Sequence, residues 1–283
     1  MLHIVGAAGR SGAALCHALA ARGTAYVPVV RNAAKWAALG LPGTPRLADL
    51  TDGAALRAAL AGSTRVASAA HARHAGAILA AAPLGTSFVF MGSTRRHSRW
   101  PDAHGDGVRQ GEAAFMASHR PGVLLHPTMI YGAQGEDNVQ RLAALLRRLP
   151  FAPLPGGGTA LVQPIHQADV TACLLSALDR AWTLPHVLDI AGPTAMPYRD
   201  FMRAVAQAAG QRAPRILPIP ALPLRLLAPL TRCLPGLPRI GADEIRRLTE
   251  DKAFDILPMR RELGVSPRSL AEGLAQTFTR ATS

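Results

Sequence analysis

Near its N-terminus the chain reads Leu2-His3-Ile4-Val5-Gly6-Ala7-Ala8-Gly9-Arg10-Ser11-Gly12. This stretch predicts a short apolar strand, a tight glycine turn and then a helix from Ala13 to Arg22, which Gly23 ends. Glycines at such a turn let the backbone approach a phosphate closely, and the first N–H groups of the helix bind the anion. The G-x-x-G-x-x-G spacing meets the general fingerprint only in part, but its place between a strand and a helix favours a dinucleotide-binding loop over a plain turn.

The end of the next apolar run, Ala25 to Val30, indicates which dinucleotide the loop binds. NAD sites usually carry an acidic residue about 20 residues beyond the glycines, whereas a basic residue there suits the 2′-phosphate of NADP. This chain has Arg31 at that point and no acidic residue before Asp49, and Arg10 adds a second cation. We therefore predict that NADP(H) is preferred over NAD(H), with the alternative that Arg31 is one of many surface arginines.

Apolar runs alternate with helical patterns along the following residues. Strands are predicted at 45–50, 65–70, 87–91 and 122–126, and helices at 53–60, 73–82 and 108–119. This alternation is typical of an α/β fold with a Rossmann-like, doubly wound parallel sheet. We predict an NAD(P)-binding Rossmann domain over 1–150, to which 160–192 returns as part of the sheet. Residues 193–283 then form a smaller C-terminal substrate-binding lobe or cap.

Ligands of such sheets bind beyond the carboxyl ends of the strands, near the point where the strand order reverses. This rule selects the glycine loop together with residues that follow the other strands. We predict that the cofactor contacts Gly6, Ala8, Gly9, Arg10, Ser11, Gly12, Arg31, Asp49, Leu50, Ala70, Ser93 and Pro127.

The composition excludes some classes of protein. The 283 residues carry a formal net charge of +13, but the cations are scattered and nearly all arginine, and few aromatic side chains are present for base stacking, so nucleic acid is not the expected partner. The chain lacks a run of about 18 apolar residues and a signal-peptide pattern, so we expect no transmembrane segment and a cytoplasmic location. Cys16, Cys173 and Cys233 are widely spaced, which predicts free thiols and no metal site.

One late segment, 216–237, is apolar and repeatedly interrupted by proline. The prolines exclude a membrane-spanning helix. The segment is interpreted as a hydrophobic cap over a substrate cleft, with a contact to a membrane surface or a protein partner as the alternative.

Taken together, the motifs resemble the NAD(P)-dependent epimerase/dehydratase family of extended or atypical short-chain dehydrogenases/reductases. The motifs are Gly6 to Gly12, Asp49-Leu50, Gly92-Ser93-Thr94, His126 to Gly132, Gln163 to Val170, Glu250 to Asp255 and Leu263 to Arg268. The resemblance implies that Asp49-Leu50 lies at the adenine and that Ser93 is a catalytic-site serine.

The chain departs from that family in its catalytic residues. The family uses a Tyr-x-x-x-Lys pair, in which the lysine cation lowers the tyrosine pKa. The only tyrosines are Tyr26, Tyr131 and Tyr198, and none is followed by lysine at the fourth position. Aligning 108–112 with the usual Lys-x-Glu helix places Asp106 and Gln110 at the Tyr and Lys positions, where neither can replace the pair.

We therefore predict Ser93, His104 and Tyr131 as catalytic residues. Histidine is a competent general acid at neutral pH, although His104 could instead be a solvated loop residue and Tyr131 could pack the cleft wall. His166 and Asp169, at a strand-to-helix junction, are assigned structural roles.

The functional prediction is an NADP(H)-dependent oxidoreductase, or an epimerase/dehydratase-like enzyme, that acts on a small molecule. The alternative is a catalytically silent nucleotide-binding sensor or scaffold of the atypical type, which the missing Tyr-Lys pair and the apolar segment favour. Fold analogy alone does not identify the substrate.

Overall fold

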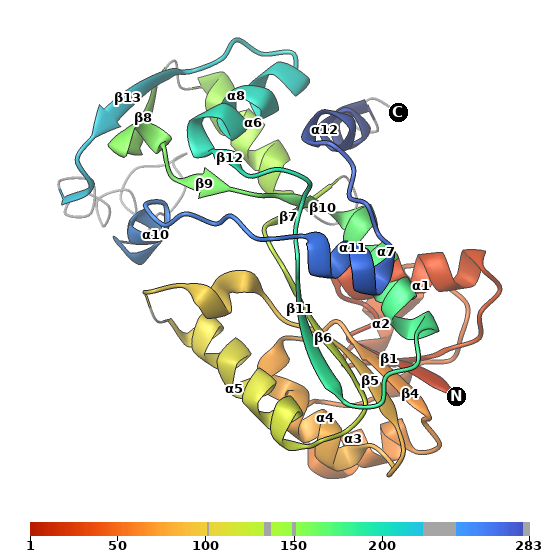
Figure 1. The fold of residues 1–283 in the computed structure, drawn as a ribbon. Helices are drawn as coiled ribbons and strands as arrows, with labels where there is room; N and C mark the ends of the chain where they lie inside the picture. The colour runs from red at the N-terminus through yellow and green to blue at the C-terminus, as the bar shows by residue number, and fades with distance from the viewer. Residues whose placement is uncertain (101, 133–136, 149–150, 223–241, 280–283) are drawn as a thin grey trace.

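The computed structural model describes residues 1–283 except 101, 133–136, 149–150, 223–241 and 280–283. Seven parallel strands form the central sheet, in the order β11-β6-β5-β4-β1-β2-β3 (Figure 1). The strands are β1 Leu2–Val5, β2 Val27–Val30, β3 Arg46–Leu47, β4 Arg65–Ser68, β5 Ser87–Met91, β6 Gly122–Pro127 and β11 Pro185–Ile190. The order reverses between β1 and β4, as in a dinucleotide-binding Rossmann sheet, so the predicted fold class is confirmed.

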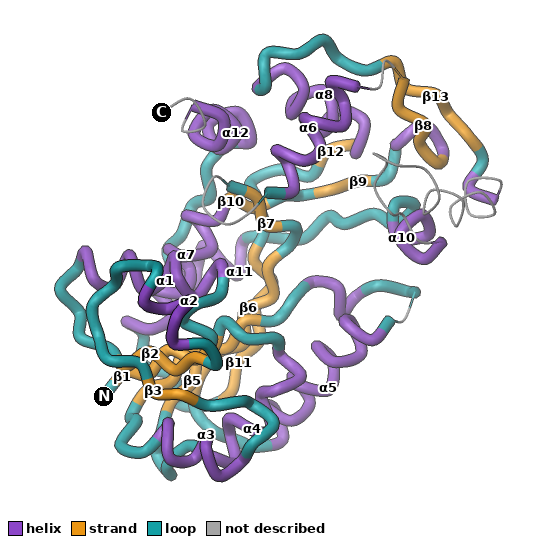
Figure 2. The backbone as a smooth tube through the Cα atoms, turned by 180° about the vertical axis from the view of Figure 1, so that it is seen from behind, coloured by secondary structure: helices purple, strands orange, loops and turns teal. Residues whose placement is uncertain are grey.

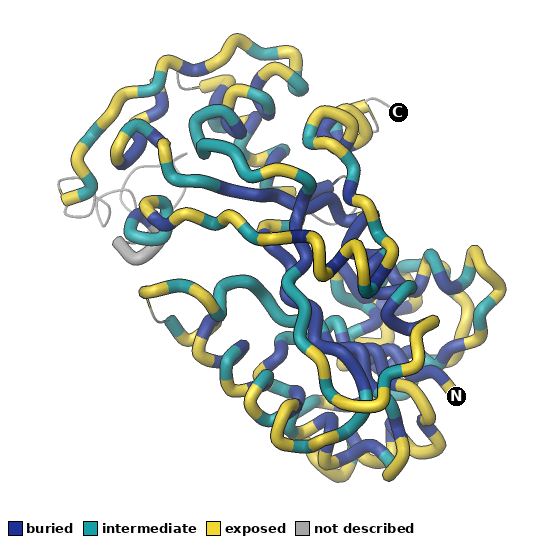
Figure 3. Tube along the Cα trace, viewed as in Figure 1, coloured by how far each residue is buried: buried dark blue, intermediate teal, exposed yellow. Residues whose placement is uncertain are grey.

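Helices cover both faces of the sheet (Figure 2). One face packs in a single cluster against α1 Arg10–Ala21, α2 Ala33–Ala37, α7 Gln167–Asp179 and α11 Leu257–Leu263. The other packs against α3 Gly53–Leu60, α4 Ala75–Ala81 and α5 Ala103–Ala117. The strands between these layers are buried, while the outward sides of the helices are exposed (Figure 3).

A smaller lobe stands beyond the carboxyl ends of the strands. It contains α6 Asn138–Arg148, β8 Phe151–Pro155, η3 Gly156–Gly158, α8 Tyr198–Ala208, β13 Arg215–Ile219, α10 Ala242–Arg247 and α12 Leu270–Thr279. The strands β7 Ile130–Tyr131, β9 Leu161–Val162, β10 Ile165–His166 and β12 Met196–Pro197 join the lobes as the pairs β10-β7 and β12-β9, while β13 pairs with β8. Because α6 packs with α8 and α12, it lies in this lobe, whereas the sequence placed it within 1–150.

Local sequence explains where several helices begin. The Asp52 side chain accepts hydrogen bonds from the backbone N–H groups of Ala54 and Ala55, both at 3.0 Å, and so starts α3. Asp102 caps α5 in the same way through the N–H of Gly105 at 2.7 Å. The predicted start of this helix at 108 was therefore wrong: the glycine-rich, polar run before it is the first turn of the helix and not a loop.

Several other predictions fall partly on described residues. Cys16 and Cys173 are buried free thiols on α1 and α7, as predicted, while Cys233 lies outside the described residues. Within the segment 216–237, residues up to 219 belong to β13, and those from 223 onward lie outside the described residues. No helix within the described ranges is long and apolar enough to cross a membrane. The helix α11, which carries Pro258 in its first turn, was not predicted.

Candidate functional site

The glycine loop forms a tight turn at the N-terminus of α1, closed by a hydrogen bond from Gly9 to Gly6. Gly6 has a φ of +75°, and a Cβ there would lie 3.1 Å from the backbone nitrogen of Ala70 after β4. A Cβ on Gly12 would lie only 2.1 Å from the Gly6 carbonyl oxygen, and Gly9 donates its N–H to that same oxygen at 2.8 Å. Only glycine fits at positions 6 and 12, so the loop holds its tight form and presents bare backbone at a helix N-terminus. This cradle fits the pyrophosphate of a dinucleotide.

The side chains of the loop do not all point to that cradle. The Ser11 hydroxyl donates to Oε1 of Gln167 at 3.2 Å and is nearly buried, so it ties α1 to α7. Only the backbone of Ser11 remains for the phosphate. The Arg10 side chain is 59% exposed and lies 4.0 Å from Asp137. Ala8 is half-buried within the turn.

The ends of β2 and β3 bring together the residues predicted at the adenosine. Arg31 is exposed directly after β2. The Asp49 carboxylate accepts hydrogen bonds from the hydroxyl and backbone N–H of Thr51, at 2.6 and 2.9 Å, which lower its pKa. The positive charges of Arg31 and His74 lower the pKa of Asp49 further, so Arg31 and Asp49 share this edge of the sheet. Leu50 is half-buried beside them.

Ser93 lies at the carboxyl end of β5, on a buried histidine. Its backbone N–H donates to Nδ1 of His126 at 3.0 Å, and its Oγ accepts from the N–H of Arg95 at 3.2 Å. A Cβ on Gly92 would be 2.4 Å from the His126 ring, so glycine makes room for the imidazole. Burial, aided by the charges of Arg96 and His97, lowers the pKa of His126 to about 3. Neutral His126 therefore fixes the Ser93 backbone through Nδ1. The Ser93 Oγ accepts a hydrogen bond from Arg95, so its own O–H can donate to a bound substrate.

A cleft of about 820 Å³ opens in front of Ser93. Its walls are residues at the ends of β5 and β6, η2 Thr94–His97 with the residues after it, and the segment 247–254. Asp102 holds the two sides together, because its Oδ2 lies 2.8 Å from Arg95 and 2.9 Å from Arg247. The Nζ of Lys252 donates to the Arg247 carbonyl at 2.5 Å, and burial lowers the pKa of Lys252. The charged residues that line the Ser93 cleft are the cations Arg95, Arg99, Arg247 and Lys252 and the anions Glu250 and Asp251, so positive charge is in excess there.

Tyr131 does not reach this cleft. The side chain is 1% exposed, its ring packs edge-on to His166 with centroids 5.2 Å apart, and a Cβ on Gly273 would lie 2.0 Å from its hydroxyl. Burial, together with the nearby Asp169 charge, raises the pKa of this phenol well above its usual value. Tyr131 is therefore part of the small-lobe core, and the prediction that it faces substrate was wrong. Pro127, buried at the end of β6, accepts a hydrogen bond from the Thr94 hydroxyl at 3.3 Å.

His104 is exposed on the first turn of α5, and its ring meets that of His71. Nδ1 of His104 lies 3.2 Å from Nε2 of His71. Partial desolvation by its neighbours, and then the charge of Arg95, lower the pKa of His104, which favours a neutral imidazole at pH 7 over a general acid. Asp106 and Gln110, at the Tyr and Lys positions of the family, are exposed.

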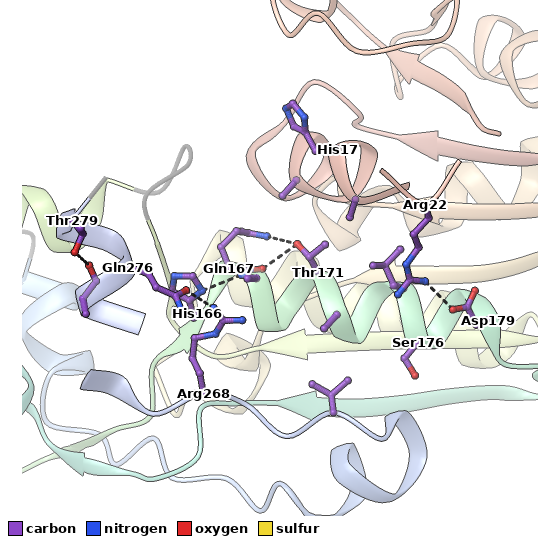
Figure 4. A pocket seen from close by; sticks show the side chains of 17 residues that line it. His17, Arg22, His166, Gln167, Thr171, Ser176, Asp179, Arg268, Gln276 and Thr279 are labelled. Carbon is purple, nitrogen blue, oxygen red and sulfur yellow. Dashed lines mark hydrogen bonds and ion pairs between the residues drawn. The ribbon is translucent and has the colours of Figure 1, made fainter. Parts of the chain in front are cut away.

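A second groove, of about 1120 Å³, lies on the outer side of α1 and α7 (Figure 4). In Figure 4, Arg22 and Asp179 reach across between the two helices, and their ion pair measures 3.0 Å. Arg268 binds the buried Asp169 through its Nε at 3.0 Å, which confirms a structural role for Asp169. Because this groove runs along helices and not at strand ends, the Ser93 cleft is the candidate active site.

Other structural residues escaped the sequence analysis. Glu112 on α5 lies 3.0 Å from Nε2 of His126 and also contacts Arg96. Gln163 is buried: its amide N–H₂ donates to the carbonyls of Gly192 and Phe254 at 2.8 and 3.2 Å, and its Oε1 accepts from the Phe254 N–H at 2.7 Å. Gln163 begins one motif of the resemblance and Glu112 ends the aligned segment 108–112, but neither position indicates which partners the folded chain supplies. Within the described residues, no group of three or more His, Cys, Asp or Glu could hold a metal ion.

The chain is similar in fold, over nearly its whole length, to solved structures of several enzymes. It is similar to an NADPH-dependent quinone oxidoreductase from Escherichia coli, solved with NADPH (TM-score 0.76, 20% identity, 98% of this chain and 100% of that one). It is also similar to a triphenylmethane reductase from Citrobacter sp. (TM-score 0.77, 14% identity, 98% and 99%) and to a UDP-glucose 4-epimerase from Thermotoga maritima (TM-score 0.75, 14% identity, 99% and 99%). At these identities the likeness shows the fold. No protein-family model and no curated protein sequence matches the chain.

Proposed function

We propose that this protein is an NADP(H)-dependent oxidoreductase that reduces a small carbonyl or quinone-like compound. The observation that carries the proposal is the bare glycine cradle at the strand-order reversal, with the Ser93 cleft beyond the neighbouring strands. Two of the proteins with this fold are named as reductases, one of them bound to NADPH. A bound nicotinamide would supply the hydride for this reduction.

The residues of the chain divide the remaining tasks. The N-terminus of α1 binds the pyrophosphate, and Arg31 with Arg10 binds the 2′-phosphate, which favours NADP(H). The Ser93 hydroxyl donates to the substrate oxygen. His104 is not among the residues that line the Ser93 cleft, but its neighbours Arg95 and Arg247 line it, and we assign His104 the role of a second donor. The cations of the cleft, Arg95, Arg247 and Lys252 among them, favour substrates that carry or develop negative charge.

Calorimetry with NADPH, NADP⁺, NADH and NAD⁺ tests the cofactor. We expect NADPH to bind more tightly than NADH, and Gly9→Asp to weaken NADPH at least about tenfold because the carboxylate repels the pyrophosphate. Gly53→Asp is the matched control, since Gly53 also opens a helix and a Cβ there meets nothing within 4 Å. Arg31→Ala should narrow the preference for NADPH, whereas Arg57→Ala on α3 should leave it unchanged.

Turnover is tested by NADPH oxidation against a panel of quinones, aldehydes and ketones. We expect reduction of at least one member, with a lower kcat in Ser93→Ala and in His104→Gln. Tight NADPH binding with no consumption over the whole panel would instead support the silent sensor, which the absence of the Tyr-Lys pair favours. Failure to bind any of the four nucleotides would refute the proposal entirely.

A further inference from the structure

His71 is held by the backbone at the start of the short helix η1 Ala72–His74. Its Nδ1 accepts a hydrogen bond from the N–H of Arg73 at 3.1 Å. On the other side of the ring, Nε2 lies 3.2 Å from Nδ1 of His104, with the two ring planes at 83° and their centroids 4.4 Å apart. The two imidazoles therefore form a directed chain that begins at a backbone N–H.

The donor at the start of this chain decides where each proton lies. A neutral imidazole has one N–H and one bare nitrogen. Since a backbone N–H can only donate, Nδ1 of His71 is the bare nitrogen and Nε2 carries the proton. That proton points to Nδ1 of His104, which must accept it, so the proton of His104 lies on Nε2.

Two glycines of α5 hold the rings in contact. A Cβ on Gly107 would lie 3.0 Å from Cε1 of His71, and a Cβ on Gly111 would lie 1.9 Å from the Ala72 carbonyl oxygen. Glycine is a poor helix former, so these positions serve the close approach of η1 to α5. This packing leaves the His71 ring little room to turn.

Burial and the surrounding charges together favour the neutral form of both rings. Burial, followed by the charges of His104, Arg73 and His74, lowers the pKa of His71 to about 4. Around His104, burial and the cations Arg95 of η2, Arg73 of η1 and Arg247 of α10 outweigh the raising effect of Asp102. Cationic neighbours disfavour an imidazolium, which would also need a different proton arrangement.

We propose that His71 is a positioning residue that fixes His104 as the neutral Nε2–H tautomer, and that His104 in this form donates a hydrogen bond to the substrate oxygen. This role rests on the proposed function. A bound reduced nicotinamide would supply the hydride from one of its C–H bonds, a C–H bond forms at the carbonyl carbon, and the C=O π electron pair moves to the oxygen. The Nε2–H of His104 stabilises that developing charge, as neutral imidazoles at helix N-termini do. The oxygen then takes its proton from water, and His104 keeps its own.

Histidine nitrogen NMR reads the tautomer directly, without turnover. In ¹⁵N-histidine-labelled full-length protein, we expect His104 as the Nε2–H tautomer in the wild type, with the assignment confirmed by its absence in His104→Gln. His71→Gln retains an N–H donor toward His104 and should retain the tautomer. His71→Phe fills a similar volume without a donor and should give a mixture of tautomers. His74→Ala on the same short helix is the control that should change neither.

Kinetics over pH 5.5 to 9 on the best panel substrate completes the test. We expect His71→Phe to lower kcat about tenfold with little change in KM, and His71→Gln to recover most of the lost kcat, because only the donor toward His104 differs between the two variants. An Nδ1–H tautomer of His104 in the wild type, or a mixed tautomer in His71→Phe with unchanged kcat, would overturn the inference. If the tautomers are as expected but no panel member is reduced, the proposed function and the donor role fail, while the positioning by His71 stands.

Discussion

The contact between α5 and η1 gives a sharp prediction for Gly111→Ala. A Cβ at this position would lie 1.9 Å from the Ala72 carbonyl oxygen and 2.5 Å from its carbon, about 1.5 Å inside ordinary van der Waals contact. The obstacle is backbone, so no side chain can rotate away to relieve it. Either η1 or α5 must therefore move.

The magnitude follows from two opposing effects. Overpacking a buried contact costs about 1–3 kcal/mol, and a backbone obstacle belongs at the upper end. Replacing glycine by alanine inside a helix returns about 1 kcal/mol. The expected net destabilisation is about 2 kcal/mol, which lowers the Tm by about 4–8 °C for a chain of this size.

Gly76→Ala on α4 is the matched control. There the new Cβ would meet only the Ala114 methyl, at the ordinary distance of 3.6 Å, so helix propensity should leave the Tm unchanged or raise it slightly. Both variants are measured by differential scanning calorimetry beside the wild type. A Gly111→Ala protein that melts within about 1 °C of the wild type would refute the packing argument, because 1 kcal/mol alone shifts Tm by more.

Two further predictions concern charged and titrating groups. Asp169→Asn leaves the Arg268 guanidinium without its buried partner and should lower the free energy of unfolding, measured in urea, by about 3 kcal/mol. Asp179→Asn breaks an exposed ion pair with Arg22 and should lower it by less than about 1 kcal/mol. Equal losses in the two variants would contradict the structural role of Asp169. His126 has a pKa of about 3 when folded and an ordinary value of 6.5, so only the unfolded chain binds its proton between these values and stability falls as the pH is lowered through that window. His126→Asn should reduce the slope of the unfolding free energy with pH by up to about 1.4 kcal/mol per pH unit in this window. An unchanged slope would show that the pKa of His126 is not lowered in the folded protein.

The fold could be predicted because its signals are local. The apolar run before Gly6, the strand at 87–91 and the cap at Asp52 each depend on residues a few positions apart, and the structure agrees with them. Ser93 is placed by the same logic, since a residue that follows a parallel strand lies at the ligand edge of the sheet.

The site itself depends on partners that are distant in the sequence. Tyr131 also follows a strand, yet α12 covers it through Gly273, far along the chain, and no local pattern reports that contact. The pairing of His71 with His104 is likewise set by how η1 packs on α5. From the sequence alone, the glycines of α5 indicate a loop. Their place in a helix is explained only by the close packing of η1 against α5, which the folded chain shows.

Gln163 shows how a side chain can substitute for a strand. Its amide gives and takes one hydrogen bond each with the backbone of Phe254, the pairing that one peptide group offers another across a sheet. These bonds hold the segment that carries Phe254 as a neighbouring strand would be held in a sheet, although residues 251–256 form no strand. Such docking needs a donor and an acceptor on one planar group. These two hydrogen bonds therefore depend on the backbone of residue 254 and not on its side chain, and a glutamate at 163 would lose one of them because its carboxylate can only accept.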